Sequence, residues 1–171
     1  MIDRQKFIDG SVGTADLADL IGDTVRSCDL SMTDYGGHRR FTGAAATVRC
    51  CDDNIVVTDA LKMPGAGRVL VVDGAGSTHT ALIGDIYGAL AADNGWAGII
   101  INGAIRDRTA LSQIPLGVKA IGTNPRKSRK TGDGETNIPV AFGGVVFHPG
   151  DQVYSDDDGI VVVSSAAQLD T

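Results

Sequence analysis

The sequence predicts a single α/β domain over residues 1–171, with a central parallel or mixed sheet and a β-rich C-terminal part. Three observations support this class. Apolar strands alternate with helical patterns in the middle of the chain, short strands separated by Gly and Asp turns follow, and no linker or repeat divides the sequence. With 171 residues and 43% hydrophobic residues, the chain can bury one substantial core.

The N-terminal third predicts one helix and one strand. From Thr14, the segment TADLADLIGD places Leu17, Leu20 and Ile21 at helical spacing. Residues 43–50, GAAATVRC, have the alternation expected of a strand.

The centre of the chain predicts parallel strands joined by helices. Residues 68–73 (RVLVVD) and 97–102 (AGIIIN) are continuous apolar runs, typical of strands that are buried on both faces. Residues 82–94 show helical spacing, 106–114 predict a short helix, and 118–122 predict another strand. This β-α-β-α-β order implies right-handed crossovers in a parallel sheet.

The last third is polar at first and then β-rich. Residues 124–137 (NPRKSRKTGDGETN) predict a surface loop. Short strands between Gly and Asp turns are then predicted at 138–142, 145–147, 151–155 and 159–163.

Composition argues against several classes of protein. The net charge of −6 and the aromatic content of 5% disfavour nucleic acid as a partner, because phosphate is repelled and bases find few stacking surfaces. Three cysteines without a C-x-x-C pair indicate neither a disulfide framework nor a zinc site. A charged N-terminus and the lack of a long apolar run predict a cytoplasmic protein with no membrane span.

Two short motifs stand out as a candidate site. Gly84-Asp85 precedes a predicted helix, and Arg106-Asp107 follows the next predicted strand after a gap of 20 residues. Because consecutive parallel strands end at the same edge of a sheet, we expect these residues to meet in one crevice. By spacing alone, an Arg-Asp pair after a strand is more often a surface ion pair.

The chemistry of such a crevice suits a small anion and a metal. Helix N-terminal amides at Gly84, Asp85, Ile86 and Tyr87 could bind a carboxylate. Arg106 offers a planar fork of donors for an oxyanion, whereas the carboxylates of Asp85 and Asp107 are hard ligands suited to Mg²⁺ or Mn²⁺.

The chain resembles the RraA-like family, which contains a regulator of ribonuclease activity and divalent-metal-dependent hydroxymethyl-oxoglutarate aldolases. The resemblance implies a compact β/β/α swivelling-type domain and a homotrimer with sites near the subunit boundaries. It extends in order over residues 67–163 through GRVLVVDGAG, GD before a helix, GIIINGAIRD, FGGVVFHPGD and YSDDDGIVVV.

The resemblance also implies roles for the candidate residues. The backbone of Gly84 to Tyr87 would bind the carboxylate of a 2-keto acid, and Arg106 would contact its keto oxygen. Asp107 would bind the metal directly, and Asp85 would act on it through water. The expected reaction is cleavage of 4-hydroxy-4-methyl-2-oxoglutarate to two pyruvates, with oxaloacetate decarboxylation as a companion activity.

A binding protein that inhibits a ribonuclease is the alternative within the same family. The family's ribonuclease regulator lacks the aspartate after the arginine, whereas this sequence keeps it as Asp107, which favours the enzyme.

Weaker motifs have simpler interpretations. The turn at 73–76 would need Gly instead of His79 to complete a G-x-G-x-x-G pattern, so a dinucleotide or S-adenosylmethionine site is disfavoured. The basic residues within 126–130 are expected in a solvated loop or at a subunit edge. Residues 156–158 (DDD) predict a tight turn between strands.

Overall fold

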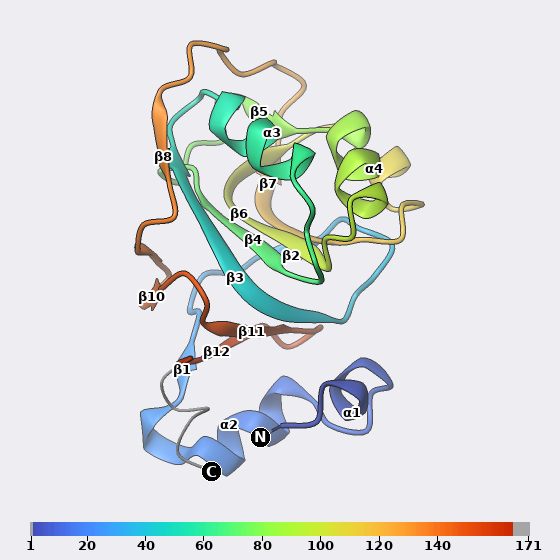
Figure 1. Ribbon diagram of the computed structural model, residues 1–171, viewed down its shortest axis with the longest axis vertical. Helices are drawn as coiled ribbons and strands as arrows, with labels where there is room; N and C mark the ends of the chain where they lie inside the picture. The colour runs from blue at the N-terminus through green and yellow to red at the C-terminus, as the bar shows by residue number, and fades with distance from the viewer. Residues whose placement is uncertain (1, 166–171) are drawn as a thin grey trace.

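The computed structural model describes residues 2–165 and contains a mixed sheet that forms the centre of the protein (Figure 1). Its middle consists of four parallel neighbours, β3 (Phe41–Cys50), β4 (Val69–Asp73), β6 (Gly98–Ile105) and β7 (Gly117–Thr123). Their apolar runs are buried on both faces, as the sequence predicts for parallel strands.

Antiparallel strands extend this sheet on both sides. The first half of β3 pairs with β11 (Gln152–Ser155), which continues to β12 (Ile160–Val163) and then to β1 (Arg26–Ser27). On the far side, β2 (Thr33–Asp34) pairs with β7. The resulting order is β1-β12-β11-β3-β4-β6-β7-β2, with β5 (Ala81–Ile83) beside β6 and β8 (Gly134–Thr136) beside β3.

Helices cover one face of the parallel strands. These helices are α3 (Ile55–Lys62), α4 (Asp85–Asp93) and α5 (Arg108–Leu111). Their buried residues Leu61, Ala91 and Leu111 join one core cluster with the facing strand residues. Within residues 2–165, no helix is long and apolar enough to cross a membrane.

The other face of the parallel strands is covered by β-structure. The hairpin of β9 (Val140–Phe142) and β10 (Val145–Phe147) packs there, with the rings of Phe142 and Phe147 4.8 Å apart between centroids. Val153 and Ile160, from β11 and β12, belong to the same cluster. Layers of β, β and α therefore follow one another, and the predicted α/β class with a β-rich C-terminal part is confirmed.

The N-terminal helices form an additional layer at the end of the molecule far from α3 and α4 (Figure 1). These are α1 (Arg4–Ile8), α2 (Thr14–Ile21) and the short η1 (Gly22–Thr24). They bury Phe7 and Leu17 against Tyr154 and Val161 of β11 and β12.

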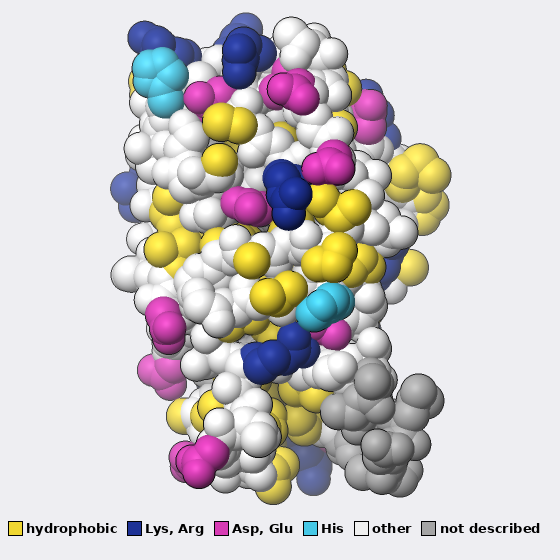
Figure 2. Space-filling view, turned by 90° about the vertical axis from the view of Figure 1, so that its left-hand side faces the viewer, with side chains coloured by type: hydrophobic (Ala, Val, Ile, Leu, Met, Phe, Trp, Pro, Cys, Tyr) yellow, Lys and Arg dark blue, Asp and Glu magenta, His cyan; other side chains and the backbone are white. Residues whose placement is uncertain are grey.

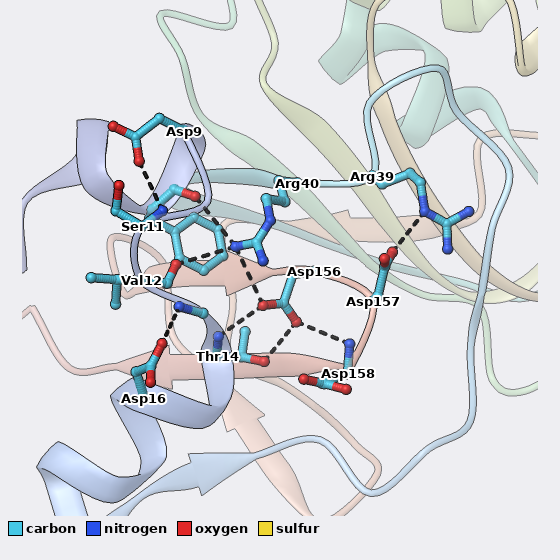
Figure 3. A network of polar contacts seen from close by, with 12 residues as sticks. Asp9, Ser11, Val12, Thr14, Asp16, Arg39, Arg40, Asp156, Asp157 and Asp158 are labelled. Carbon is cyan, nitrogen blue, oxygen red and sulfur yellow. Dashed lines mark hydrogen bonds and ion pairs between the residues drawn. The ribbon is translucent and has the colours of Figure 1, made fainter.

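The buried carboxylate of Asp156 fastens this layer to the turn between β11 and β12 (Figure 3). The sequence predicted this turn. Asp156 accepts hydrogen bonds from the amide and hydroxyl of Thr14 and lies 3.6 Å from a guanidinium nitrogen of Arg40. Burial alone would raise the pKa of Asp156, but Thr14, the amide of Asp158 and Arg40 outweigh it and lower that pKa.

Three predictions about elements need correction. Leu82 belongs to a strand, β5, so the helix predicted over 82–94 is restricted to Asp85–Asp93. The strand predicted at 97–102 continues to Ile105, because β5 provides a partner for its last residues. The surface loop predicted at 124–137 contains the exposed strand β8. The helices α1 and α3 have no counterpart among the predictions.

The packing of the Phe41 ring depends on glycine at the N-terminal ends of β6 and β7. Its ring is 2% exposed and covers Gly98 and Gly117, where an added Cβ would overlap the ring. Phe41 thus occupies the space that side chains at these two positions would fill.

Gly117→Ala should therefore destabilise the protein by about 2 kcal/mol, because the new methyl group forces a buried ring to move. Gly122→Ala, in the same strand, is the matched control, since its Cβ would meet only Thr78 Cγ2 at 3.4 Å. Urea unfolding of both variants measures the difference, and equal loss of stability in the two would contradict this account of Phe41.

Candidate functional site

The candidate site is formed where β5 runs parallel to the last residues of β6. Ala81 pairs with Ala104 and Ile83 with Ile105. The backbone amide of Arg106 then donates a hydrogen bond of 3.0 Å to the carbonyl oxygen of Ile83. This pairing sets the first turn of α4 directly beside the residues that follow β6, and it brings the two sequence motifs together.

Gly84 allows the closest approach between the two motifs. It is buried and lies immediately before α4. A Cβ at this position would overlap Asp107 Oδ2 and lie 3.2 Å from Arg106 Cγ. Any other residue would therefore push the Arg106–Asp107 pair away from the start of the helix.

Asp107 has a left-handed backbone conformation, with φ 57° and ψ 39°, at the start of α5. This region is unfavourable for side chains other than Asn and Asp, and such residues are found disproportionately at functional sites. Its Oδ2 lies 3.6 Å from Arg106 Nε, and the two side chains are 43% and 34% exposed. A partly solvated pair at this distance can exchange its partner for a ligand at little cost.

Two adjoining hollows contain five of the six predicted residues. Gly84, Ile86, Tyr87 and Arg106 line a cavity of about 270 Å³. Arg106 and Asp107 line a neighbouring hollow of about 280 Å³. The sixth residue, Asp85, is absent from both linings, and its Oδ1 accepts a 2.9 Å hydrogen bond from the amide of Ile86.

The structure adds four polar residues that the sequence analysis did not select. Lys127, Ser128 and Lys130, from the predicted solvated loop, line the 270 Å³ cavity together with Asn54. Asn54 donates to the carbonyl oxygen of Leu82 at 3.1 Å, and its buried Oδ1 has no hydrogen-bond partner within residues 2–165. The run of basic residues was the available signal, but only the fold shows which of them face the cavity.

The two hollows differ in their acidic lining. Arg106, Lys127 and Lys130 line the first, and no carboxylate does, whereas Arg106, Arg108 and the carboxylate of Asp107 line the second. The N-terminal amides of α4 add to this positive potential. The first hollow thus suits a small anion, and the carboxylate of Asp107 lies beside it.

Asp107 is the carboxylate beside this anion cavity to which a divalent cation could bind. Within residues 2–165, no three His, Cys, Asp or Glu side chains gather into a group that could hold a metal. Mg²⁺, however, is commonly bound through one or two carboxylates, with water and substrate completing its shell. The half-exposed carboxylate of Asp107 has the hard oxygen donors for that arrangement.

Asp53 holds the basic loop against the cavity. It is fully buried and accepts hydrogen bonds from the amides of Thr131 (2.7 Å), Gly132 (3.2 Å) and Ile55 (3.1 Å). Burial alone would raise the pKa of Asp53, but the hydroxyl of Thr131 and these amides outweigh it and lower the pKa to about 2. One carboxylate thus links the loop to the first turn of α3.

Asp53→Asn should loosen the loop and reduce stability by about 2 kcal/mol, since an amide replaces an acceptor of several hydrogen bonds. The low pKa of Asp53 in the folded protein means that the charged carboxylate stabilises the fold above pH 3.8. That contribution is lost as the pH falls towards 2. Denaturant unfolding at pH 7 and near pH 3 should show a smaller difference between variant and parent at the lower pH, and a constant difference would contradict this role.

Fold and site together define an α/β protein with a small cationic cavity and a carboxylate at the carboxyl ends of its parallel strands. The family model RraA-like, described as Aldolase/RraA, matches residues 14–162. The chain belongs to the RraA-like family, as the sequence predicted.

Three solved structures are similar to this chain over nearly all of its length. A protein from Geobacillus kaustophilus, described as S-adenosylmethionine:2-dimethylmenaquinone methyltransferase, is 44% identical, with a TM-score of 0.89 over 94% of this chain and 99% of that one. The RNA-processing inhibitor RraA from Thermus thermophilis is 38% identical, with a TM-score of 0.86 over 89% and 92%. RraAS2 from Streptomyces coelicolor, an unusual member of the RNase ES inhibitor RraA family, is 29% identical, with a TM-score of 0.74 over 96% and 88%.

Proposed function

We propose that this protein is a divalent-metal-dependent lyase that cleaves 4-hydroxy-4-methyl-2-oxoglutarate to two pyruvates and also decarboxylates oxaloacetate. The observation that carries the proposal is the carboxylate of Asp107, held in a left-handed conformation beside Arg106 and against Gly84. A role limited to binding another protein gives no reason for a partly exposed carboxylate held next to a cationic cavity.

The proposed binding mode uses both hollows. The 2-keto acid carboxylate lies at the N-terminus of α4, and Arg106 donates to the keto oxygen. Asp107 would hold Mg²⁺ or Mn²⁺, and Asp85 would contact its water shell. When bound, the metal would supply Lewis-acid polarisation of the keto group. Lys127 and Lys130 would bind the second carboxylate of the substrate, which lies at the other end of the molecule.

The reaction breaks the bond between C3 and C4 of the substrate. Removal of the C4 hydroxyl proton turns C4 into the keto carbon of the first pyruvate, and the bonding electrons pass to C3 as the enolate of the second. Arg106 stabilises the developing negative charge on the enolate oxygen, and protonation at C3 completes the second pyruvate. Loss of CO₂ from oxaloacetate produces the same enolate, which accounts for the companion activity.

Inhibition of a ribonuclease is the second candidate, because two of the similar structures are described as RNA-processing or RNase ES inhibitors. In that role the protein would bind the ribonuclease, since its net charge of −6 disfavours RNA. On the face shown in Figure 2, Lys and Arg side chains are dispersed among acidic and apolar ones, without a continuous basic track.

A cytoplasmic homotrimer is compatible with either role, and a monomeric mass in solution would count against the trimer.

The structure disfavours methyl transfer from S-adenosylmethionine. The glycine-containing turn after β4 closes on itself, with the amide of Ser77 donating to the carbonyl oxygen of Gly74 at 3.1 Å. It leads into β5 rather than into a helix whose N-terminus could receive a cofactor.

Asp107→Ala should abolish metal-dependent pyruvate release, with a loss of at least about 100-fold in kcat/KM, because the direct metal ligand is removed. The assay measures pyruvate from both keto acids with Mg²⁺ or Mn²⁺, before and after EDTA. Stability should fall by no more than about 1 kcal/mol, because the side chain is 43% exposed and the only cost is that of alanine in a left-handed backbone conformation.

The Asp107→Ala protein also separates the two candidate functions. Retained binding to a ribonuclease with lost turnover is expected if a catalytic and a binding role coexist. Absence of turnover in the folded, metal-supplied parent would overturn the lyase and leave the ribonuclease inhibitor as the better explanation.

Lys127→Ala/Lys130→Ala should raise KM for 4-hydroxy-4-methyl-2-oxoglutarate about tenfold and change kcat little, because a binding contact remote from the breaking bond is removed. Lys62→Ala, an exposed lysine of α3 paired with Asp59, is the control. Steady-state kinetics distinguish the outcomes, and an unchanged KM would remove the two lysines from the binding site.

A further inference from the structure

A second cavity, of about 840 Å³, lies at the opposite edge of the parallel strands. It is bounded by α1, the start of β3, and the residues that precede β6 and β7. It shares no lining residue with the candidate site. We call it the α1 cavity; its lining consists of Arg4, Gln5, Ile8, Gly37, His38, Arg39, Arg40, Phe41, Thr42, Trp96, Ala97, Pro115 and Asp157.

The α1 cavity concentrates positive charge in an acidic protein. Three arginines and His38 line it, against one carboxylate, Asp157. The chain as a whole has a net charge of −6. Clustered cations in a crevice focus the local field and attract small anions, even where the net charge of the protein is negative.

The arginines divide into one that is engaged in the fold, Arg40, and two that are available, Arg39 and Arg4; Figure 3 shows Arg40 and Arg39 with their partners. Arg40 donates to the carbonyl oxygens of Val12 (3.2 Å) and Phe7 (3.4 Å), so it forms part of the wall. Arg39 donates to Asp157 at 2.7 Å, but both side chains are 65% exposed. Such a pair contributes little stability and can exchange its carboxylate for a phosphate.

Arg4 is the second available arginine. Within residues 2–165, neither its guanidinium nor the His38 ring makes a hydrogen bond or ion pair, and both residues are exposed. Two guanidinium groups at the mouth of one cavity can each bind a phosphate through paired N–H donors.

The remaining wall is apolar. Ile8 is 40% exposed and Pro115 is exposed, whereas Trp96, which also lines the cavity, is only 5% exposed and offers a ligand little surface. The volume falls within the range of about 300–1,000 Å³ that is common for small-molecule sites. Inorganic phosphate alone would leave most of this space and all of the apolar wall uncovered.

We propose that the α1 cavity is a second binding site, separate from the candidate lyase site, for a phosphorylated small molecule with a flat apolar ring, of the size of a nucleoside monophosphate. Arg4 and Arg39 bind the phosphate, and Ile8 and Pro115 contact the ring. The proposal does not depend on the lyase activity.

Adenosine 5′-monophosphate, inorganic phosphate and adenosine are suitable probes. Calorimetric titration of the full chain should give a Kd of about 1 mM or lower for the monophosphate, and at least tenfold weaker binding for either fragment. Trp96 is the only tryptophan and lies in the wall of this cavity, so its fluorescence should change with the same midpoint.

Matched variants test the assignment. Arg4→Ala/Arg39→Ala should weaken binding at least tenfold with unchanged circular dichroism, whereas Lys6→Ala on the outside of α1 and Asp107→Ala at the other edge should leave it unchanged. Three results would overturn the proposal. The first is no heat and no change in Trp96 fluorescence up to about 10 mM ligand. The second is the same affinity in the double variant as in the parent protein, and the third is Trp96 emission that changes with protein concentration but not with ligand. The last result would show that a second copy of the chain fills the cavity.

Discussion

The pairing of β5 with the end of β6 is the contact on which the geometry of the candidate site depends. Three residues, Ala81 to Ile83, make this strand, and the hydrogen bond from Arg106 to Ile83 continues it. Without it, the start of α4 and the Arg106–Asp107 pair would follow separate loops. Gly84 completes the arrangement because the absence of a side chain lets the carboxylate of Asp107 approach the helix. Backbone pairing thus positions the site more than side-chain contacts do.

The parallel strands all run in one direction, so the candidate site lies at their carboxyl ends and the α1 cavity at their amino ends. At their carboxyl ends, the strand termini and the first turn of α4 gather Arg106, and the loop held by Asp53 adds Lys127 and Lys130. These three cations line one cavity, and the buried carboxylate of Asp53 fastens the loop that supplies two of them. At the amino ends of the strands, the N-terminal helices create the α1 cavity and are themselves fastened by a buried carboxylate, Asp156. In both places an acidic residue in the interior permits a basic surface in an acidic protein.

Sequence reasoning predicted the parallel centre, the C-terminal strands and the convergence of Gly84 with Arg106 and Asp107, because continuous apolar runs and motif spacing carry that information. It was wrong about Leu82, whose apolar spacing fits a helix although the residue belongs to strand β5. It did not predict α3, since its first residues, Ile55 to Thr58, are β-branched and favour strands in isolation. Packing of Val57 and Leu61 into the core overrides that preference. The positions of Lys127 and Lys130 were likewise beyond the sequence, because they depend on a long-range hydrogen bond to Asp53.

The exposed, left-handed position of Asp107 has an evolutionary consequence. Its side chain supports no part of the core, and glycine or asparagine would adopt this backbone conformation as easily. A single substitution there could remove the proposed chemistry and leave the scaffold intact or even more stable. Selection for the reaction and selection for folding therefore act independently at this residue, so one ancestral framework could diverge into catalysts and into proteins that only bind partners.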